Sequence, residues 1–424
     1  GKSGRDLGAD QEKRIRGLCG VRMSGIEERA RKAREKKALY GTDVDLDTYE
    51  SEAKPQSIVE RAEDLPDDVK KAALDVGVKL DSESSGAYVQ MDQTPVVAKS
   101  NYEGVEIMDM ASALKKYDFL QDYWWKLVAP DADKYTADVA RAPPAGYFIR
   151  AKKGMKTVFP IKSCLYLGSS NLNQRVHNVI IAEEGSELHV ITGCTTPAHV
   201  QRGLHAGVSE FYIQKDARVS FTMVHSWGKE VEVRPRTGIT IAEGGSLSNN
   251  YILLRPVKTL QTFPTATLAG RGAVASFNTV IYSSMGNIDV GSNVNLDAPD
   301  TSAESISRVV SVGGDVIARG RMTGRVPGAR AHLECVGLLL SDKGRIYSIP
   351  ELDGQSRDLD MSHEAAVGRI SEEELEYLMS RGLSSEQATS VIVRGFLDVE
   401  IKGLPEELKK EIKDITKRED LKGS

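Results

Sequence analysis

The sequence predicts a mainly β protein, in which a right-handed parallel β-helix is flanked by N-terminal and C-terminal α-helical regions. Three observations predict this. The central residues 147–352 are rich in Val, Ile, Thr, Ser and Gly and have no helical period, which is typical of many short strands. Turn-type residues recur there at a nearly constant step. Helix start and stop signals reappear afterwards. We therefore expect three parts, 1–146, 147–352 and 353–424, in the 424 residues.

The N-terminal part is expected to be helical and begins with a basic segment. Residues 1–41 hold twelve Lys and Arg against six Asp and Glu, a net charge of +6. Residues 25–39 are good helix formers with opposite charges four apart, which indicates an exposed, solvated helix. A second helix is expected over 108–128 with Asp109 as its N-cap. Its cluster Tyr123–Trp125 favours core packing, with stacking on a flat cofactor as the alternative.

The repeat in the central part is the strongest signal obtained from the residues alone. The turn residues are separated by 31, 29, 27, 29 and 27 positions, and they are Gly185, Asp216, Gly245, Gly272, Thr301 and Gly328. A constant step of this size indicates one coil per repeat, with two or three strands in each coil. A β-sandwich would instead show tight hairpin turns such as Asn-Gly, which are almost absent here.

The C-terminal part contains the start and stop signals of three short helices. Two capping boxes, two candidate C-caps and one proline at a first helical position define them: Ser371 with Glu374, Ser384 with Gln387, Gly382, Gly395 and Pro405. Short helices of this kind seldom stand alone. We expect them to dock on the β-helix, on a partner, or on both.

Composition excludes several classes of protein. A net charge of -5 gives no reason to expect nucleic-acid binding, and 28% charged beside 40% hydrophobic residues is not a disordered composition. No run of about 18 apolar residues predicts a membrane span. The four cysteines form no Cys-x-x-Cys pair, which argues against a disulfide scaffold or a zinc ribbon. Reduced thiols and the absence of a signal-peptide pattern suggest a cytoplasmic protein.

Two cysteines are candidates for chemistry. Cys194 lies between Gly193 and Pro197 at what the pattern predicts to be the edge of a strand, which suits exposure and attack on a sulfur donor. Cys335 lies inside an apolar strand, where a buried inert thiol is the ordinary interpretation. Together with the pair His363–Glu364 it offers the thiolate, imidazole and carboxylate that iron accepts. Sequence spacing alone does not bring these residues together.

Several motifs in one order resemble the SufB/SufD family of iron–sulfur cluster scaffold proteins. The resemblance spans about residues 95–415 and rests on these segments: Ile191–Pro197, Leu204–Val208, Val224–Trp227, the Cys335 strand, His363–Ile370, Tyr377, Arg381–Gly382, Gly395–Phe396 and Leu404–Pro405. It implies the same helix, β-helix, helix architecture that the repeat predicts. One departure is that the chain has only Cys19 in place of the N-terminal cysteine cluster of many bacterial SufB proteins.

The resemblance implies roles for individual residues. Cys194 matches the cysteine that accepts persulfide sulfur, and His225 and Trp227 match positions along a sulfur path through the β-helix. Cys335 matches the cysteine at the scaffold dimer interface where the cluster is built. The pair His363–Glu364 matches candidate iron ligands beside it.

The resemblance also implies partners and cargo. We expect a homodimer that binds a SufC-like ABC ATPase through its C-terminal helices. It would take sulfur from a donor, build a transient iron–sulfur cluster and pass it to acceptor proteins, without being an enzyme itself. A bound reduced flavin, associated with bacterial relatives, stays open.

Two alternatives remain. One is a structural SufD-like subunit without its own cluster. The other is a β-helix carbohydrate-active enzyme, whose acids would be Asp289, Asp297, Asp300 and Glu304.

Overall fold

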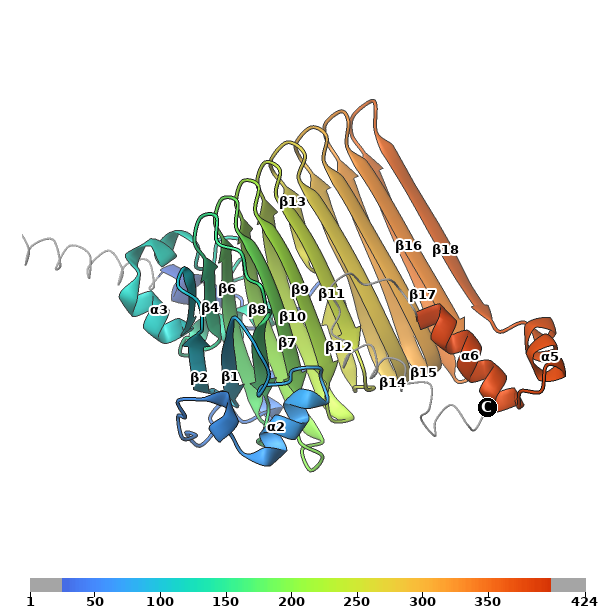
Figure 1. Ribbon diagram of the computed structural model, residues 1–424, viewed down its shortest axis with the longest axis horizontal. Coiled ribbons are helices and arrows are strands. Elements are labelled where there is room, and N and C mark those ends of the chain that lie inside the picture. The colour runs from blue at the N-terminus through green and yellow to red at the C-terminus, as the bar shows by residue number, and fades with distance from the viewer. Residues whose placement is uncertain (1–24, 398–424) are drawn as a thin grey trace, which may run out of the picture.

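The computed structural model describes residues 25–397 and shows a parallel β-solenoid with helices at both ends (Figure 1). Its strands form two faces. Face A consists of β1 (Gly86–Met91), β5 (Ile161–Tyr166), β7 (Glu187–Thr195), β9 (Arg218–Ser226), β11 (Ser246–Leu253), the first halves of β14 (Val274–Leu296) and β15 (Ser302–Gly324), β16 (Arg330–Leu339) and β18 (Asp360–Arg369). The parallel β-solenoid expected from the repeat is confirmed.

Face B closes the other side of each coil. It consists of β4 (Tyr147–Ala151), β6 (Asn173–Ala182), β8 (Arg202–Ile213), β10 (Glu230–Ile241), β12 (Thr259–Thr262), β13 (Thr265–Leu268), the second halves of β14 and β15, and β17 (Gly344–Gly354). The strands β14 and β15 continue around the corner from one face to the other. Figure 1 shows the coils stacked in chain order from the N-terminal to the C-terminal end.

A column of left-handed residues forms one corner of the solenoid. Their φ angles lie between 55° and 80°, and they are Gly185, Asp216, Gly244, Gly272, Asp300, Gly328 and Asp358. Glycine and aspartate recur there because they tolerate positive φ at lower cost than other residues. This column is the physical origin of the repeat. Two of the turn residues chosen from the sequence, Gly245 and Thr301, lie one position after it.

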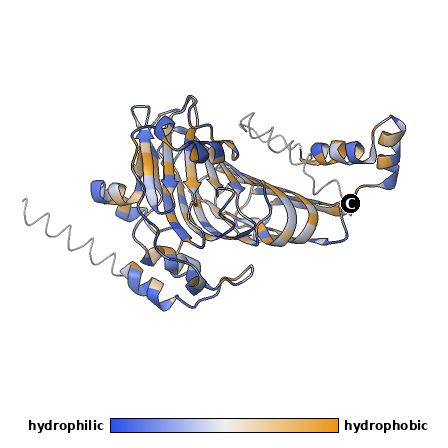
Figure 2. Cartoon of the chain, turned by 90° about the horizontal axis from the view of Figure 1, so that it is seen from below, coloured by the Kyte–Doolittle hydropathy of each residue, from blue (hydrophilic) through white to orange (hydrophobic). Residues whose placement is uncertain are grey.

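The interior of the solenoid is the main core. Side chains at alternate positions of both faces point into it, including Val190, Phe221, Ile241 and Leu296, all almost fully buried. Polar side chains are interspersed among them, and these matter for the site below. Figure 2 shows hydrophobic and hydrophilic bands succeeding one another along the strands, as alternation requires.

Helices cover the outer faces only locally. The helix α2 (Asp67–Leu74), after η2 (Ala62–Asp64), packs on the first coils of face A, and α6 (Ser385–Leu397) packs on the later coils of the same face. The elements that cover the start of face B are α3 (Met110–Lys116), η3 (Asp118–Asp122) and α4 (Lys134–Arg141). The loop that contains η1 (Leu46–Thr48) packs beside β6 and contacts β10.

The N-terminal region differs from the helical expectation. It contributes β1 to the solenoid, and β2 (Thr94–Ser100) and β3 (Val105–Asp109) pair antiparallel with β1 and β4. Asp109 does cap a helix, accepting a 2.9 Å hydrogen bond from the Ser112 backbone N–H, but that helix ends after Lys116 instead of continuing to 128. Residues 25–32 are helical, yet Ala30 packs against α4, so this helix is not wholly solvated.

At the C-terminal end the strands run beyond residue 352, where we expected helix. The strand β17 continues to Gly354, and β18 adds one more face A strand before the helices begin. Ser371 is the N-cap of α5 (Glu372–Ser380) and accepts from the Glu374 backbone N–H, without the return bond from the Glu374 side chain. The Ser384–Gln387 capping box of α6 has both of its hydrogen bonds, and Gly382 has φ 94°. Gly395 lies inside α6 and is no C-cap, which corrects that assignment. Pro405 lies outside the described residues.

Candidate functional site

Cys194 lies inside the solenoid and not at an exposed strand edge. It is fully buried near the end of β7 and belongs to the interior core. Burial raises the pKa of its thiol well above the usual value, with the neighbouring Cys164 acting in the same direction. The expectation that this thiol is exposed is therefore wrong, while its role as a sulfur acceptor stays a prediction. Gly193 lies inside β7 with its outer side packed against Val76 and Val78, and Pro197 follows the end of the strand, so the strand is covered on both sides.

Aromatic rings surround the interior position next to Cys194. His225 on β9 is the direct register partner of Cys194 on β7, so the two side chains lie side by side on the interior surface. The ring of Trp227 lies 5.5 Å from that of His225, centroid to centroid. The sequence resemblance named these three residues, and the fold brings them together.

Two members of this cluster were not predicted. The His205 ring, from the opposite face, lies 5.1 Å from Trp227 and 6.0 Å from His225. The Tyr251 hydroxyl is 2.8 Å from His225 Nδ1. A signal for His205 existed, because it lies in the segment Leu204–Val208 that carries the resemblance. Tyr251 follows only from the register of β11 with β9.

The two histidines are kept neutral by their surroundings. Burial lowers the pKa of His205 to about 4, and burial lowers that of His225 well below its usual value, with His205 adding to the effect. His205 Nδ1 lies 2.9 Å from the Gln174 side-chain oxygen. The Nε2 of His225 and the Nε1 of Trp227 are buried without a hydrogen-bond partner among the described residues. Buried polar atoms of this kind are costly and uncommon.

A row of register-aligned interior side chains runs from this cluster to Cys335. On face A the register aligns, coil by coil, Thr192, Met223, Tyr251, Thr279, Ser307 and Cys335. Cys194 lies in the neighbouring row of interior side chains, two residues along β7 from Thr192. Five strand-to-strand steps separate β7 from β16, which is about 24 Å at the usual strand spacing. A small interior cavity of about 30 Å³ lies midway and is lined in part by Met223, Tyr251 and Thr279.

Cys335 lies in the last coils, where the solenoid is open. Its side chain faces the interior but is only partly buried, unlike Cys164 and Cys194. Burial raises the pKa of the Cys335 thiol, while the Ser348 hydroxyl and the Arg308 guanidinium act in the opposite direction. Cys164 is fully buried and burial raises its pKa to about 12, which fits an inert thiol.

The predicted iron ligands lie on one strand but on opposite surfaces. His363 pairs with Leu333 and Glu364 with Glu334, so in the alternation His363 shares the interior surface with Cys335 while Glu364 faces outward. Both are exposed on β18. No cluster of three or more His, Cys, Asp or Glu side chains that could hold a metal ion occurs within residues 25–397. One chain in this conformation does not assemble a complete iron site from these residues.

The aromatic cluster Tyr123–Trp125 is not a platform for a flat cofactor. Trp124 stacks on His177 with ring centroids 3.7 Å apart, and Trp125 contacts the same ring edge-on. Both tryptophans are buried. The residues present do not fit a flavin at this position, and the core-packing interpretation is confirmed.

The acidic residues of the glycosidase alternative do not form a catalytic pair. Asp289 binds Arg319, Asp297 binds Arg325 and Asp300 binds Arg271, each in an ion pair. Asp300 also occupies the left-handed corner. These carboxylates are structural, and Glu304 is exposed apart from them.

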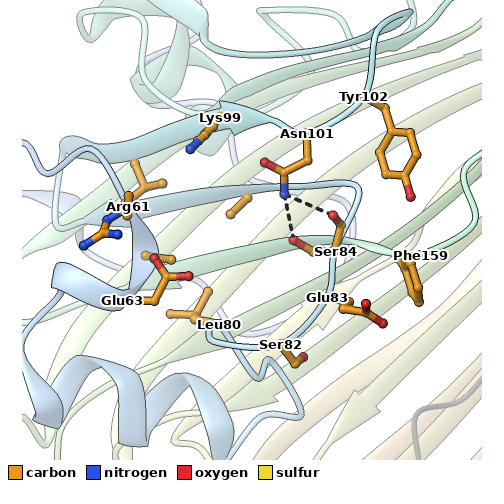
Figure 3. Close-up of a pocket in the computed structure, with 13 residues that line it drawn as sticks. Arg61, Glu63, Leu80, Ser82, Glu83, Ser84, Lys99, Asn101, Tyr102 and Phe159 are labelled. Atoms are coloured by element: carbon orange, nitrogen blue, oxygen red, sulfur yellow. Dashed lines mark hydrogen bonds between the residues drawn. The ribbon is translucent and has the colours of Figure 1, made fainter.

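A large cavity of about 490 Å³ lies at the N-terminal end (Figure 3). Its wall carries charges of both signs, including Arg61, Glu63, Glu83 and Lys99. Asn101 donates from its side chain to the Ser84 carbonyl at 3.0 Å, closing one side of it. Neither Cys194 nor Cys335 lines this cavity.

Comparisons with known proteins agree with this architecture. Residues 165–396 match the family model described as "SUF system FeS cluster assembly, SufBD core domain". A protein of Methanothermobacter thermautotrophicus, named iron-sulfur cluster assembly SufBD family protein, is 48% identical over 394 residues, covering 91% of this chain and 96% of the relative. Proteins of the same name from Archaeoglobus fulgidus and Pyrococcus horikoshii are 49% and 32% identical, covering 81% and 84% of this chain and 93% and 82% of the relatives.

A parallel β-solenoid with these matches is an iron–sulfur cluster assembly protein. The chain belongs to the SufBD family. None of the helices in the described part of the chain is long and apolar enough to cross a membrane.

Proposed function

We propose that this chain is a scaffold on which an iron–sulfur cluster is assembled at the interface of a homodimer. The observation that carries the proposal is the position of Cys335 at the open end of the solenoid, with His363 on the neighbouring strand and the same surface. A thiolate and an imidazole are both iron ligands. Because one chain presents too few ligands together, a second chain supplies the remainder.

The strand β18 supports this dimer. Its ten residues are almost all exposed, and within the described residues it pairs with β16 alone. An unpaired edge of this length is a template for another strand. Pairing of two β18 strands about a two-fold axis would place Cys335 and His363 of both copies near that axis. Glu364, on the outer surface, would guide iron to the interface.

Sulfur would reach Cys335 from Cys194 through the interior. Cys194 takes sulfur from a persulfide donor, and His225 and Trp227 line the beginning of the path. The row of interior side chains from Thr192 to Cys335 and the small cavity beside Thr279 form the middle section of this path. Transfer from the donor to Cys194 moves one sulfur atom from a persulfide to a thiol and releases the donor thiol, so no external oxidant or reductant is needed for that step. The aligned side chains between Cys194 and Cys335 include no thiol, so a small polysulfide would carry the sulfur onward.

The C-terminal helices would bind a SufC-like ABC ATPase. Three apolar side chains on α5 and α6 are unusually exposed, Tyr377 at 58%, Met379 at 45% and Val391 at 40%. On the other side of α6, Val393 and Leu397 anchor the helix to face A. ATP-driven dimerisation of two ATPases would then move the last coils and open the interface to iron.

In this proposal the chain is not itself an enzyme, acts in the cytoplasm, and releases its cluster to acceptor proteins. An imidazole or carboxylate ligand holds iron less firmly than a full set of thiolates and so favours release. The alternative, a structural SufD-like subunit, predicts that Cys335 is dispensable and that the chain purifies with a separate SufB-like partner.

Pull-down with the cognate ATPase, followed by anaerobic iron and sulfide analysis, tests the proposal. Val391→Glu should abolish capture of the ATPase, while Val158→Glu, an equally apolar residue that is 74% exposed elsewhere, should not. Equal capture by both variants would contradict the assigned surface. Absence of iron and sulfide from the wild-type complex would contradict the scaffold role.

A further inference from the structure

The unpartnered nitrogen atoms next to Cys194 require an explanation. Trp227 Nε1 always carries a hydrogen, and it is buried without an acceptor within the described residues. Leaving such a donor unpaired in a buried site is costly, so the site calls for an acceptor. Two orphaned nitrogens, from Trp227 and His225, occur in the same ring cluster.

The hydrogen-bond network assigns the His205 nitrogens, and the direction of the Tyr251 hydrogen bond sets those of His225. The Gln174 side-chain nitrogen donates to the Asp92 and Tyr166 carbonyls at 2.8 and 3.1 Å, so its oxygen faces His205 and accepts from Nδ1–H. Because the imidazole is neutral, His205 Nε2 is then a bare acceptor. Conversely, when the Tyr251 hydroxyl donates to His225 Nδ1, His225 Nε2 carries the hydrogen.

Gly207, two residues further along β8, packs against the acceptor nitrogen. A Cβ atom at Gly207 would lie 3.1 Å from His205 Nε2 and 3.5 Å from a Val176 methyl group. That is closer than a Cβ normally approaches, so a side chain at this position would displace the His205 ring from its place beside the Cys194 cluster. Two donors and one acceptor therefore surround the interior surface onto which the Cys194 side chain points.

We propose that His205, His225, Trp227 and Tyr251 form a cage that binds the sulfur delivered to Cys194, with the Trp227 and His225 N–H groups donating to the terminal sulfur of the Cys194 persulfide. This rests on the proposed role of Cys194 as sulfur acceptor and deepens it. Such donors stabilise an anionic sulfur strongly because the interior excludes water. Tyr251 is a positioning residue, since it acts by fixing the proton on His225.

His205 supplies the proton acceptor for the transfer. The Cys194 sulfur attacks the terminal sulfur of a persulfide or polysulfide donor, the donor S–S bond breaks, and a new S–S bond forms on Cys194. The Cys194 proton passes to His205 Nε2 and then to the leaving thiolate. Atoms and electrons balance without a further reactant. A buried thiol of raised pKa needs such a base close by.

Inorganic polysulfide is a suitable probe because it is small, and its reaction leaves a persulfide on the cysteine and releases hydrosulfide. Peptide-level mass spectrometry after anaerobic loading gives the rate at which Cys194 gains one sulfur atom. Its decay under dithiothreitol gives the persulfide lifetime. Trp227→Phe and Tyr251→Phe should shorten the lifetime, the first by about ten-fold or more, the expected loss for one hydrogen bond to a charged group. His205→Gln and Gly207→Ala should slow loading instead.

Matched controls separate the cage from general effects on folding. Trp124→Phe and Tyr212→Phe alter buried rings on the outer side of face B, whose contacts are with His177 and with Tyr123, away from the cage. They should load and decay as wild type. If wild type gains sulfur on Cys194 but Trp227→Phe and Tyr251→Phe match it in lifetime, the cage is wrong and the acceptor role of Cys194 stands. If wild type gains no sulfur at Cys194, both are wrong.

Discussion

Cys194 and His225 are register partners on the adjacent strands β7 and β9, and both side chains lie inside the solenoid, fully buried. This relationship changes how sulfur chemistry at Cys194 must be understood. A thiol on the surface could meet a donor protein directly. Here the sulfur atom has to enter the solenoid, and the interior must replace the stabilisation that water would give to a sulfur anion.

The burial of the thiols predicts an order of reactivity. Iodoacetamide should alkylate the partly exposed Cys335 at least about ten-fold faster than Cys194 or Cys164, because alkylation needs both access and thiolate. Timed quenching and mass spectrometry of the labelled peptides measure the three rates. Faster labelling of Cys194 than of Cys335 in the folded protein would contradict the interior position of Cys194.

The left-handed corner predicts which substitutions the coils tolerate. Gly272 has φ 68° and no atom within 4 Å of a would-be Cβ, so a substitution there costs backbone strain alone. Gly272→Val should lower the free energy of unfolding by about 1–2 kcal/mol. Gly272→Asn should cost clearly less, because asparagine visits this region readily. Chemical denaturation of the two variants measures the difference, and equal losses would show that the corner conformation is not the cause.

Buried neutral histidines predict a loss of stability in mild acid. The pKa of His205 is about 4 in the folded protein, below its unfolded value near 6.5, so protonation favours the unfolded chain. The contribution is fully present above pH 6.5 and is lost as pH falls toward 4, by about 1.4 kcal/mol per pH unit. His225 and His177, whose pKa values burial also lowers, act in the same direction.

The His205→Gln variant isolates this effect from the titration of carboxylates. Guanidinium unfolding at pH 7.5, 6 and 5 should give a shallower pH dependence for the variant than for wild type. The difference should approach the slope expected for one proton. Parallel dependences would mean that His205 is not buried in neutral form.

The free edge of β18 predicts a dimer that a charge disrupts. Val367 is 42% exposed on this strand, and lysine on an edge strand opposes pairing with another edge. Light scattering should show a wild-type dimer, weakened at least about ten-fold in Val367→Lys. The Val158→Lys protein, with the same change at a loop residue, should remain dimeric. A wild-type protein that light scattering shows to be monomeric, both alone and with its ATPase, would contradict the hypothesis of a shared interface.

The sequence predicted the features that local physics determines. The coil repeat was visible because positive φ selects glycine and aspartate once per coil, and the helix caps at Ser371 and Ser384 were visible because capping follows short fixed spacings. Burial of Cys194 was missed for a different reason. A glycine packed under a covering segment and a proline just after a strand have the same pattern as an exposed loop, and only the contacts of Gly193 with Val76 and Val78 decide between them.

Other features depend on contacts distant in sequence. The strands β1 and β18 extend the solenoid at its ends, and both were assigned to helical parts. The strand β1 lies before the regular turns, whereas β18 follows Asp358, a left-handed turn residue that the sequence-based selection stopped short of. His205 joins the Cys194 cluster across two faces, which no single-strand pattern reveals. The opposite orientations of His363 and Glu364 followed from alternation alone, and that could have been predicted once β18 was recognised as a strand.

The central claim is that Cys335 holds the nascent cluster. Anaerobic reconstitution of the full chain with iron and sulfide, followed by Mössbauer spectroscopy, tests it most directly, with Cys335→Ala compared to wild type and to the matched Cys164→Ala control. We predict a cluster spectrum in wild type and in Cys164→Ala, and its loss in Cys335→Ala. An unchanged cluster in Cys335→Ala would contradict the account.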